Sequence, residues 1–174
     1  MPSNKPRLYI GLYARNVPNS YHWAFLVSPK KEAGTQNETT RYHVVNRPAM
    51  RDGAVKDMWT YEQRDLVSMK TQMLLVRVLI AKIAKPRAAF DECLARVPVV
   101  QDDPDWRCRA WVSNALARLV DDKILGGQTQ DWTFIERESV AYVERKKTEG
   151  RFQKEPAPTE VPTYDLIVAK EVVR

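Results

Sequence analysis

The chain has 174 residues, of which 44% are hydrophobic and 29% are charged, and its formal net charge is +6. This composition excludes disordered and fibrous proteins and is most simply that of one globular domain with a real core. The longest apolar-rich stretch, residues 74–84, contains Arg77 and Lys82 and is too short to span a bilayer. Because no apolar secretory signal opens the chain, we expect two reduced cysteines and a cytoplasmic protein.

The first half of the chain has the alternation and β-branched or aromatic content of strands, separated by polar, Pro- and Gly-containing loops. The predicted strands are residues 7–13, 21–27, 41–46, 58–63 and 74–83. The intervening stretches 14–20, 28–40 and 47–57 are predicted loops. The second and third strands are expected to pair as a hairpin.

The second half changes to helical periodicity. One helix is predicted from Pro86 to about Val97, and a second from Pro104 to about Asp122, with Asp103 as its N-cap. A third is predicted for residues 132–147. We therefore predict a single α+β domain over residues 1–150, in which an antiparallel sheet from the N-terminal half packs against helices of the C-terminal half. The proline-containing segment 151–174 is predicted to be extended, with a possible return as a strand at 164–173.

Cys108 is the first residue of the apolar face of the second predicted helix, a face that continues with Val112, Ala115, Leu116 and Leu119. A thiol at a helix start lies near unpaired backbone N–H groups and the positive end of the helix dipole, and both favour the nucleophilic thiolate. We expect these charge effects to outweigh burial. The second cysteine, Cys93, lies mid-helix and is predicted to be a neutral core thiol.

The chain has only two histidines, His22 and His43, and both fall within predicted neighbouring strands. Buried imidazoles need hydrogen-bond partners, so this pair is either structural or forms a base and its orienting partner for Cys108. The two histidines and Cys108 are also zinc-type ligands, but no closely spaced ligand pair supports a metal site.

The elements HWAFLV, YHVVN and DWRCRAWVSNAL, in this order, resemble the circularly permuted papain-like fold of the lecithin:retinol acyltransferase family and the NlpC-type peptidases. They are also similar to fungal proteins of this length with HWA, YHV and W-x-C-x-x-W-V elements. The resemblance implies a cofactor-independent acyl-transfer enzyme, a hydrolase or an acyltransferase, with Cys108 as nucleophile, His22 as base and His43 as its orienting partner. The chain departs from the acyltransferase pattern beside Cys108, where Arg107 and Arg109 replace Asn and Glu.

The substrate expected from these residues is a small molecule or an acylated peptide. Arg107 and Arg109 are candidate ligands for an anionic group, or else solvated arginines, and Trp23 and Trp106 are candidate walls of a cleft, or else core residues. Two other functions stay open: a non-catalytic binding module with a basic surface, and an acyltransferase that takes its acyl group from an aminoacyl-tRNA.

Overall fold

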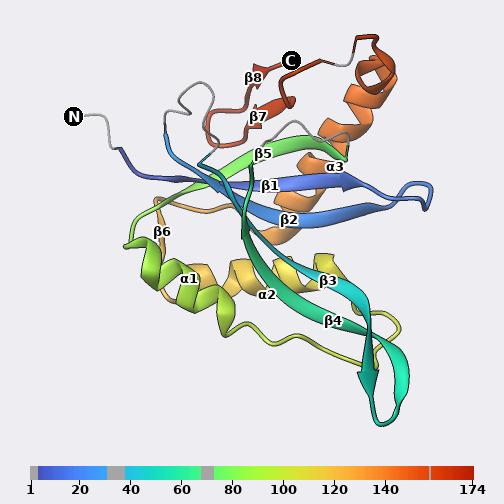
Figure 1. Cartoon of the computed structure of the whole chain (residues 1–174). Helices are drawn as coiled ribbons and strands as arrows, with labels where there is room; N and C mark the ends of the chain where they lie inside the picture. Colours follow the sequence, from blue (N-terminus) through green and yellow to red (C-terminus); the bar gives the residue numbers. More distant parts are fainter. Residues whose placement is uncertain (1–3, 31–37, 68–72, 157) are drawn as a thin grey trace.

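A sheet built mainly from the first half of the chain is covered on one face by helices from the second half (Figure 1). The structure, a computed structural model, describes residues 4–30, 38–67, 73–156 and 158–174. Its strands and helices are β1 (Arg7–Ala14), β2 (Tyr21–Ser28), β3 (Thr40–Arg51), β4 (Ala54–Asp65), β5 (Leu74–Ile83), α1 (Arg87–Ala95), α2 (Cys108–Asp121), β6 (Leu125–Gly126), α3 (Trp132–Thr148), β7 (Thr163–Asp165) and β8 (Lys170–Val173).

The strand order is β4-β3-β2-β1-β5-β7-β8, and β6 pairs with β5. All neighbouring strands are antiparallel except β5 and β7, which are parallel. The predicted α+β class is therefore confirmed, and strands β1–β5 form the expected antiparallel sheet. The sheet as a whole is mixed because the C-terminal segment adds a parallel strand.

Side-chain alternation along the central strands separates a large core from a small one. On the helix face, Leu8, Ile10 and Leu12 of β1 are fully buried with residues of α1, α2 and α3 in one cluster. On the opposite face, Tyr9, Tyr13 and their neighbours form a smaller cluster, against which Leu66 and Val161 pack. Odd and even positions of β1 and β2 thus face different surroundings.

The expected loop at 47–57 is wrong, because β3 and β4 form one long hairpin that extends beyond the rest of the sheet (Figure 1). Asp52 and Gly53 make its turn with positive φ values of 54° and 75°, a geometry that matches the twist of paired strands. Most side chains in the outer arm are exposed on both faces. It therefore lacks the hydrophobic alternation by which a strand is recognised. Part of the other expected loop, 28–40, lies outside the described residues.

The helices at 87–95 and 132–148 match their predictions within about two residues. The Asp131 carboxylate caps α3 by accepting the Phe134 N–H at 3.0 Å. The loop before α2 runs out along the β3–β4 hairpin (Figure 1). There the Gln101 amide bonds both the N–H and the C=O of Trp59, at 3.0 and 2.7 Å, which occupies part of the open edge of β4.

The C-terminal segment returns as two short strands, β7 and β8, rather than the single strand predicted at 164–173. β7 joins the sheet beside β5, where Arg77 Nε donates to Thr163 Oγ1 at 2.8 Å. Leu166 is buried in the main core. Residues 163–173 are therefore part of the same folded unit as residues 7–148.

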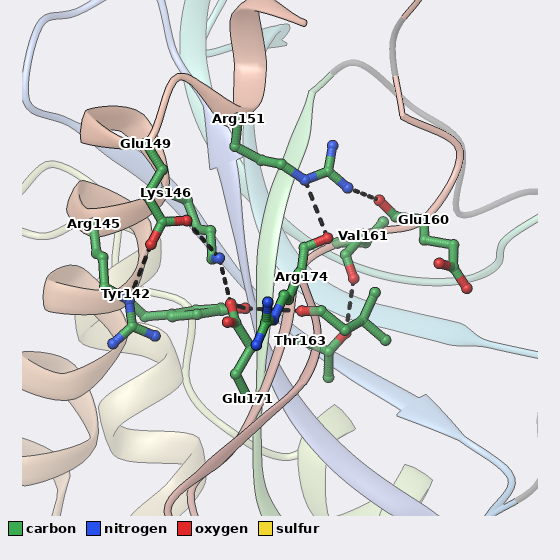
Figure 2. Close-up of polar contacts among 11 residues, drawn as sticks. Tyr142, Arg145, Lys146, Glu149, Arg151, Glu160, Val161, Thr163, Glu171 and Arg174 are labelled. Atoms are coloured by element: carbon green, nitrogen blue, oxygen red, sulfur yellow. Dashed lines mark hydrogen bonds and ion pairs between the residues drawn. The ribbon is translucent and has the colours of Figure 1, made fainter.

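A buried ion pair fastens this segment to α3 (Figure 2). Lys146, a residue only 2% exposed, forms ion pairs through its ammonium group with Glu149 and with Glu171 of β8. The Tyr142 hydroxyl donates to Glu171 Oε1 at 2.9 Å. Shortly after α3, Arg151 donates hydrogen bonds to the backbone oxygens of Glu160 and Arg174. Each buried cation is thus satisfied by a group that the returning segment supplies.

Candidate functional site

Helix α2 begins at Cys108 itself, four residues later than predicted from Pro104. The Asp103 carboxylate accepts the Asp105 N–H at 2.9 Å and closes a turn before the helix. Arg107 then has extended backbone angles, φ −144° and ψ 173°, and acts as the N-cap. Cys108 is therefore the first helical residue, where a backbone N–H has no acceptor within the helix.

The Cys108 thiol is 1% exposed and accepts a hydrogen bond from the Trp23 backbone N–H, with an N–Sγ distance of 3.5 Å. Burial raises the pKa of Cys108, and it outweighs the opposite effects of the Trp23 N–H, the Arg15 charge and the N–H groups of the helix start. The expectation that charge would outweigh burial is therefore wrong, since desolvation of a thiolate at this position costs more free energy than these groups supply.

The two histidines form a hydrogen-bonded chain with a carboxylate. His22 Nε2 lies 2.7 Å from His43 Nδ1, and His43 Nε2 lies 3.1 Å from Glu62 Oε1. His43 and Glu62 face each other in the register of β3 and β4. The sequence-predicted pair is thus brought together, and Glu62 extends it by one group.

Burial, more than any neighbouring charge, keeps both imidazoles neutral. Burial, followed by the proximity of His43 and of arginines, lowers the pKa of His22 to about 3. Burial lowers the pKa of His43 to about 4, although the hydrogen bond to Glu62 opposes the shift. The hydrogen bond from His43, together with that from Arg47, lowers the pKa of Glu62 to about 2, so the carboxylate is ionised.

Cys108, His22 and His43 line one cavity of about 370 Å³, together with Arg15, Arg41, Val45, Asn46, Arg47 and Trp59. The pairing of β2 with β3 ends at Phe25 and Tyr42. His22 and His43 lie beyond this last pair, where the two strands separate, and the cavity is there. Within the described residues, no hydrogen bond joins Cys108 to His22. Catalytic hydrogen bonds are often loose in unliganded proteins, so this leaves the two side chains as a candidate pair that shares a cavity.

Cys108 also lines a second cavity, of about 520 Å³. Three of the candidate substrate-binding residues, Trp23, Arg107 and Arg109, line it, and the Arg109 guanidinium is paired with Glu136. Trp106 lines neither cavity. It is 6% exposed within the core and packs edge-on against Trp59, at 5.5 Å between ring centroids, which matches the core position that the sequence analysis gave as the alternative.

A family model, described as a family of unknown function (DUF6914), matches residues 5–173, nearly the whole chain. The chain belongs to this family. No curated protein and no solved structure matches it.

Two residues of this candidate site were missed by the sequence analysis. Glu62 falls within the strand predicted at 58–63. Only the pairing of β3 with β4, which sets it opposite His43, identifies it as a site residue. Arg15 lies in the turn after β1 and lines both cavities with Cys108. Cationic residues are too frequent in the chain for their positions alone to have indicated it.

The described residues contain no group of three or more His, Cys, Asp or Glu side chains placed to hold a metal ion. The zinc alternative therefore gains no support from the arrangement of His22, His43 and Cys108. No helix in the described ranges is long and apolar enough to cross a bilayer.

Proposed function

We propose that the protein is a thiol-dependent acyl-transfer enzyme in which Cys108 is the nucleophile, His22 the base and His43 its orienting partner. The observation that carries this proposal is the hydrogen-bonded chain Glu62–His43–His22, which reaches the cavity that Cys108 also lines. A nucleophile, a base and a group that orients the base are the three parts of the generalised catalytic triad.

Because the Glu62 carboxylate is ionised, the positions of the protons in the hydrogen-bonded series Glu62–His43–His22 can be inferred. A carboxylate only accepts, so His43 Nε2 carries a proton, and the neutral ring then presents Nδ1 as an acceptor. His22 Nε2 must therefore donate to His43 Nδ1, which leaves the lone pair of His22 on Nδ1. Glu62 and His43 thus act as positioning residues that keep His22 in the tautomer of a general base.

The proposed chemistry begins with the proton on sulfur, since the pKa of Cys108 is raised and that of His22 is lowered. As Sγ attacks a substrate carbonyl carbon, the thiol proton passes to His22 Nδ1. The backbone N–H of Cys108 is the candidate donor to the developing oxyanion. The leaving group then departs with the proton from His22, and a thioester remains on Cys108. Attack on this thioester by water or an amine, with His22 again as base, releases the product and restores the thiol.

The finer fold assignment, a circularly permuted papain-like fold, belongs to the same proposal. It is supported by the chain order His22, His43, Cys108 and by a cysteine that opens a helix packed against the strand carrying the first histidine. The lipid substrate of the acyltransferases is not carried over, because the residues that flank Cys108 differ from theirs.

The test is to trap the acyl-enzyme with p-nitrophenyl acetate and to locate the added acetyl group by mass spectrometry. We expect acetylation of Cys108 in the wild type and in the Cys93→Ala control, none at this position in Cys108→Ala, and a loss of about 100-fold in rate in His22→Ala. Acetylation that is unaffected by His22→Ala, or that falls equally on Cys93, would favour the non-catalytic binding module instead.

A further inference from the structure

Two guanidinium groups beside Cys108 have no carboxylate partner among the described residues. Arg15 Nη1 donates only to the Ser20 hydroxyl, at 3.3 Å, and Arg107 Nη1 donates to the Trp106 carbonyl at 2.8 Å. Both side chains are exposed and line the 520 Å³ cavity with Cys108. They come from separate segments, the turn after β1 and the residue that caps α2, so the fold places these two charges together.

The other charged groups of this cavity are internally compensated. Arg109 is paired with Glu136. Glu144 forms an ion pair with Lys147 at 3.1 Å and accepts a hydrogen bond from the Tyr21 hydroxyl. Each carboxylate that lines the cavity therefore already has a cation, and the uncompensated charge is positive.

Arg15 also lines the 370 Å³ cavity that holds His22 and His43, so it stands at the junction of the two cavities, as Cys108 does. Its charge opposes the rise that burial causes in the pKa of Cys108 and adds to the lowering of the pKa of His22, as expected for a cation close to both groups. An anion bound by Arg15 therefore lies within reach of the carbonyl that Cys108 attacks.

We propose that Arg15 and Arg107 form an anion subsite, so that the acyl substrate carries a carboxylate or a phosphate close to its reacting carbonyl. This inference rests on the proposed function, because it takes Cys108 as the reacting group. It replaces Arg109 with Arg15 in the pair of arginines expected from the sequence. A planar guanidinium binds either anion with two parallel hydrogen bonds.

The test compares two alkylating reagents of similar size, iodoacetate and iodoacetamide, which differ in charge. Both react with the same thiolate, so the ratio of their rates at one pH cancels the thiolate fraction of Cys108. The reference is the same chain unfolded in urea, and a Cys93→Ala background leaves one thiol. We expect the iodoacetate to iodoacetamide ratio to be about 10-fold higher in the folded protein than in the unfolded chain.

Arg15→Gln and Arg107→Gln should each lower this ratio by about 3-fold. The ratio is the readout because loss of the Arg15 charge also raises the pKa of Cys108, which slows both reagents alike. Arg118→Gln is the matched control, because it removes the same charge from the far end of α2, where Arg118 pairs with Asp122. Its ratio should equal that of the parent protein. A ratio in the folded protein no higher than in the unfolded chain, or one lowered equally by Arg118→Gln, overturns the subsite.

Protection of Cys108 from iodoacetate by inorganic phosphate but not by acetate assigns the anion as a phosphate, and the reverse assigns a carboxylate. Protection by neither overturns the proposal. This failure is distinct from failure of the proposed function, which is read from acetylation of Cys108 by an uncharged ester and its dependence on His22.

Discussion

The pH dependence of Cys108 acetylation distinguishes a neutral imidazole base from a preformed thiolate. Burial first, and then nearby positive charge, lowers the pKa of His22 to about 3, whereas burial raises the pKa of Cys108. Lowering the pH through the usual histidine range therefore leaves both groups in the forms that general-base catalysis requires: the thiol keeps its proton and the imidazole keeps its lone pair.

The expected change in rate follows from comparing the pKa of an ordinary histidine with that of His22. A histidine with an ordinary pKa of about 6.5 falls from about 76% to about 3% neutral between pH 7 and pH 5, a loss of about 25-fold. With its pKa at about 3, His22 is still about 99% neutral at pH 5. The rate of acetylation by p-nitrophenyl acetate should then change by less than about 1.5-fold over this range.

The assay is the rate of acetyl incorporation at Cys108, measured by intact mass, with circular dichroism at each pH to verify the fold. In His22→Ala the remaining reaction needs the thiolate itself, so its rate should fall about 10-fold per pH unit, or about 100-fold in all. A wild-type rate that falls about 25-fold with a midpoint near pH 6.5 would refute the reasoning, because the base would then titrate as a solvated histidine.

Three further outcomes are expected. Glu62→Gln removes a charge-assisted hydrogen bond worth about 1.5 kcal/mol, so acetylation of the thiol should slow about 10-fold; an unchanged rate would remove Glu62 from the proposed chain. Iodoacetamide at about pH 8 should modify Cys108 before Cys93, because Cys108 lines both cavities, whereas Cys93 lines neither and its pKa is raised to about 11 by burial and a neighbouring carboxylate; peptide mapping that finds Cys93 modified first contradicts this. Lys146→Met deprives Glu171 of its buried cation and should lower the free energy of unfolding in urea by about 2–3 kcal/mol; a loss below about 0.5 kcal/mol would show that the ion pair is dispensable.

The residues of the candidate site differ in how far the sequence could indicate them. His22, His43 and Cys108 were found because the chain has only two histidines and two cysteines, so each occurrence carries information. Glu62 is one of 22 acidic residues. It is selected only by the register of β3 and β4, and that register depends on a turn at Asp52 that the sequence pattern did not reveal.

The fold was predictable where an element is buried along its whole length, as β5 is, or along one face, as α3 is. β5 was predicted with its observed bounds, and α3 within one residue, because buried positions recur along both. The outer part of the β3–β4 hairpin and the start of α2 were misplaced for a different reason. Both depend on local backbone geometry, at Asp52 and at Arg107, which hydrophobic periodicity does not encode.

The position of the His43–Glu62 pair within the β3–β4 hairpin determines which changes in chain length the site tolerates. A one-residue insertion in a single arm near the pair forces either a bulge or a slipped register, and a slip turns Glu62 to the other face of the sheet, away from His43. Insertions of equal length in both arms, next to the Asp52 turn, leave the two side chains opposite each other. The β3–β4 hairpin can therefore be lengthened at its exposed tip, in related or engineered proteins, without breaking the hydrogen bonds among Glu62, His43 and His22.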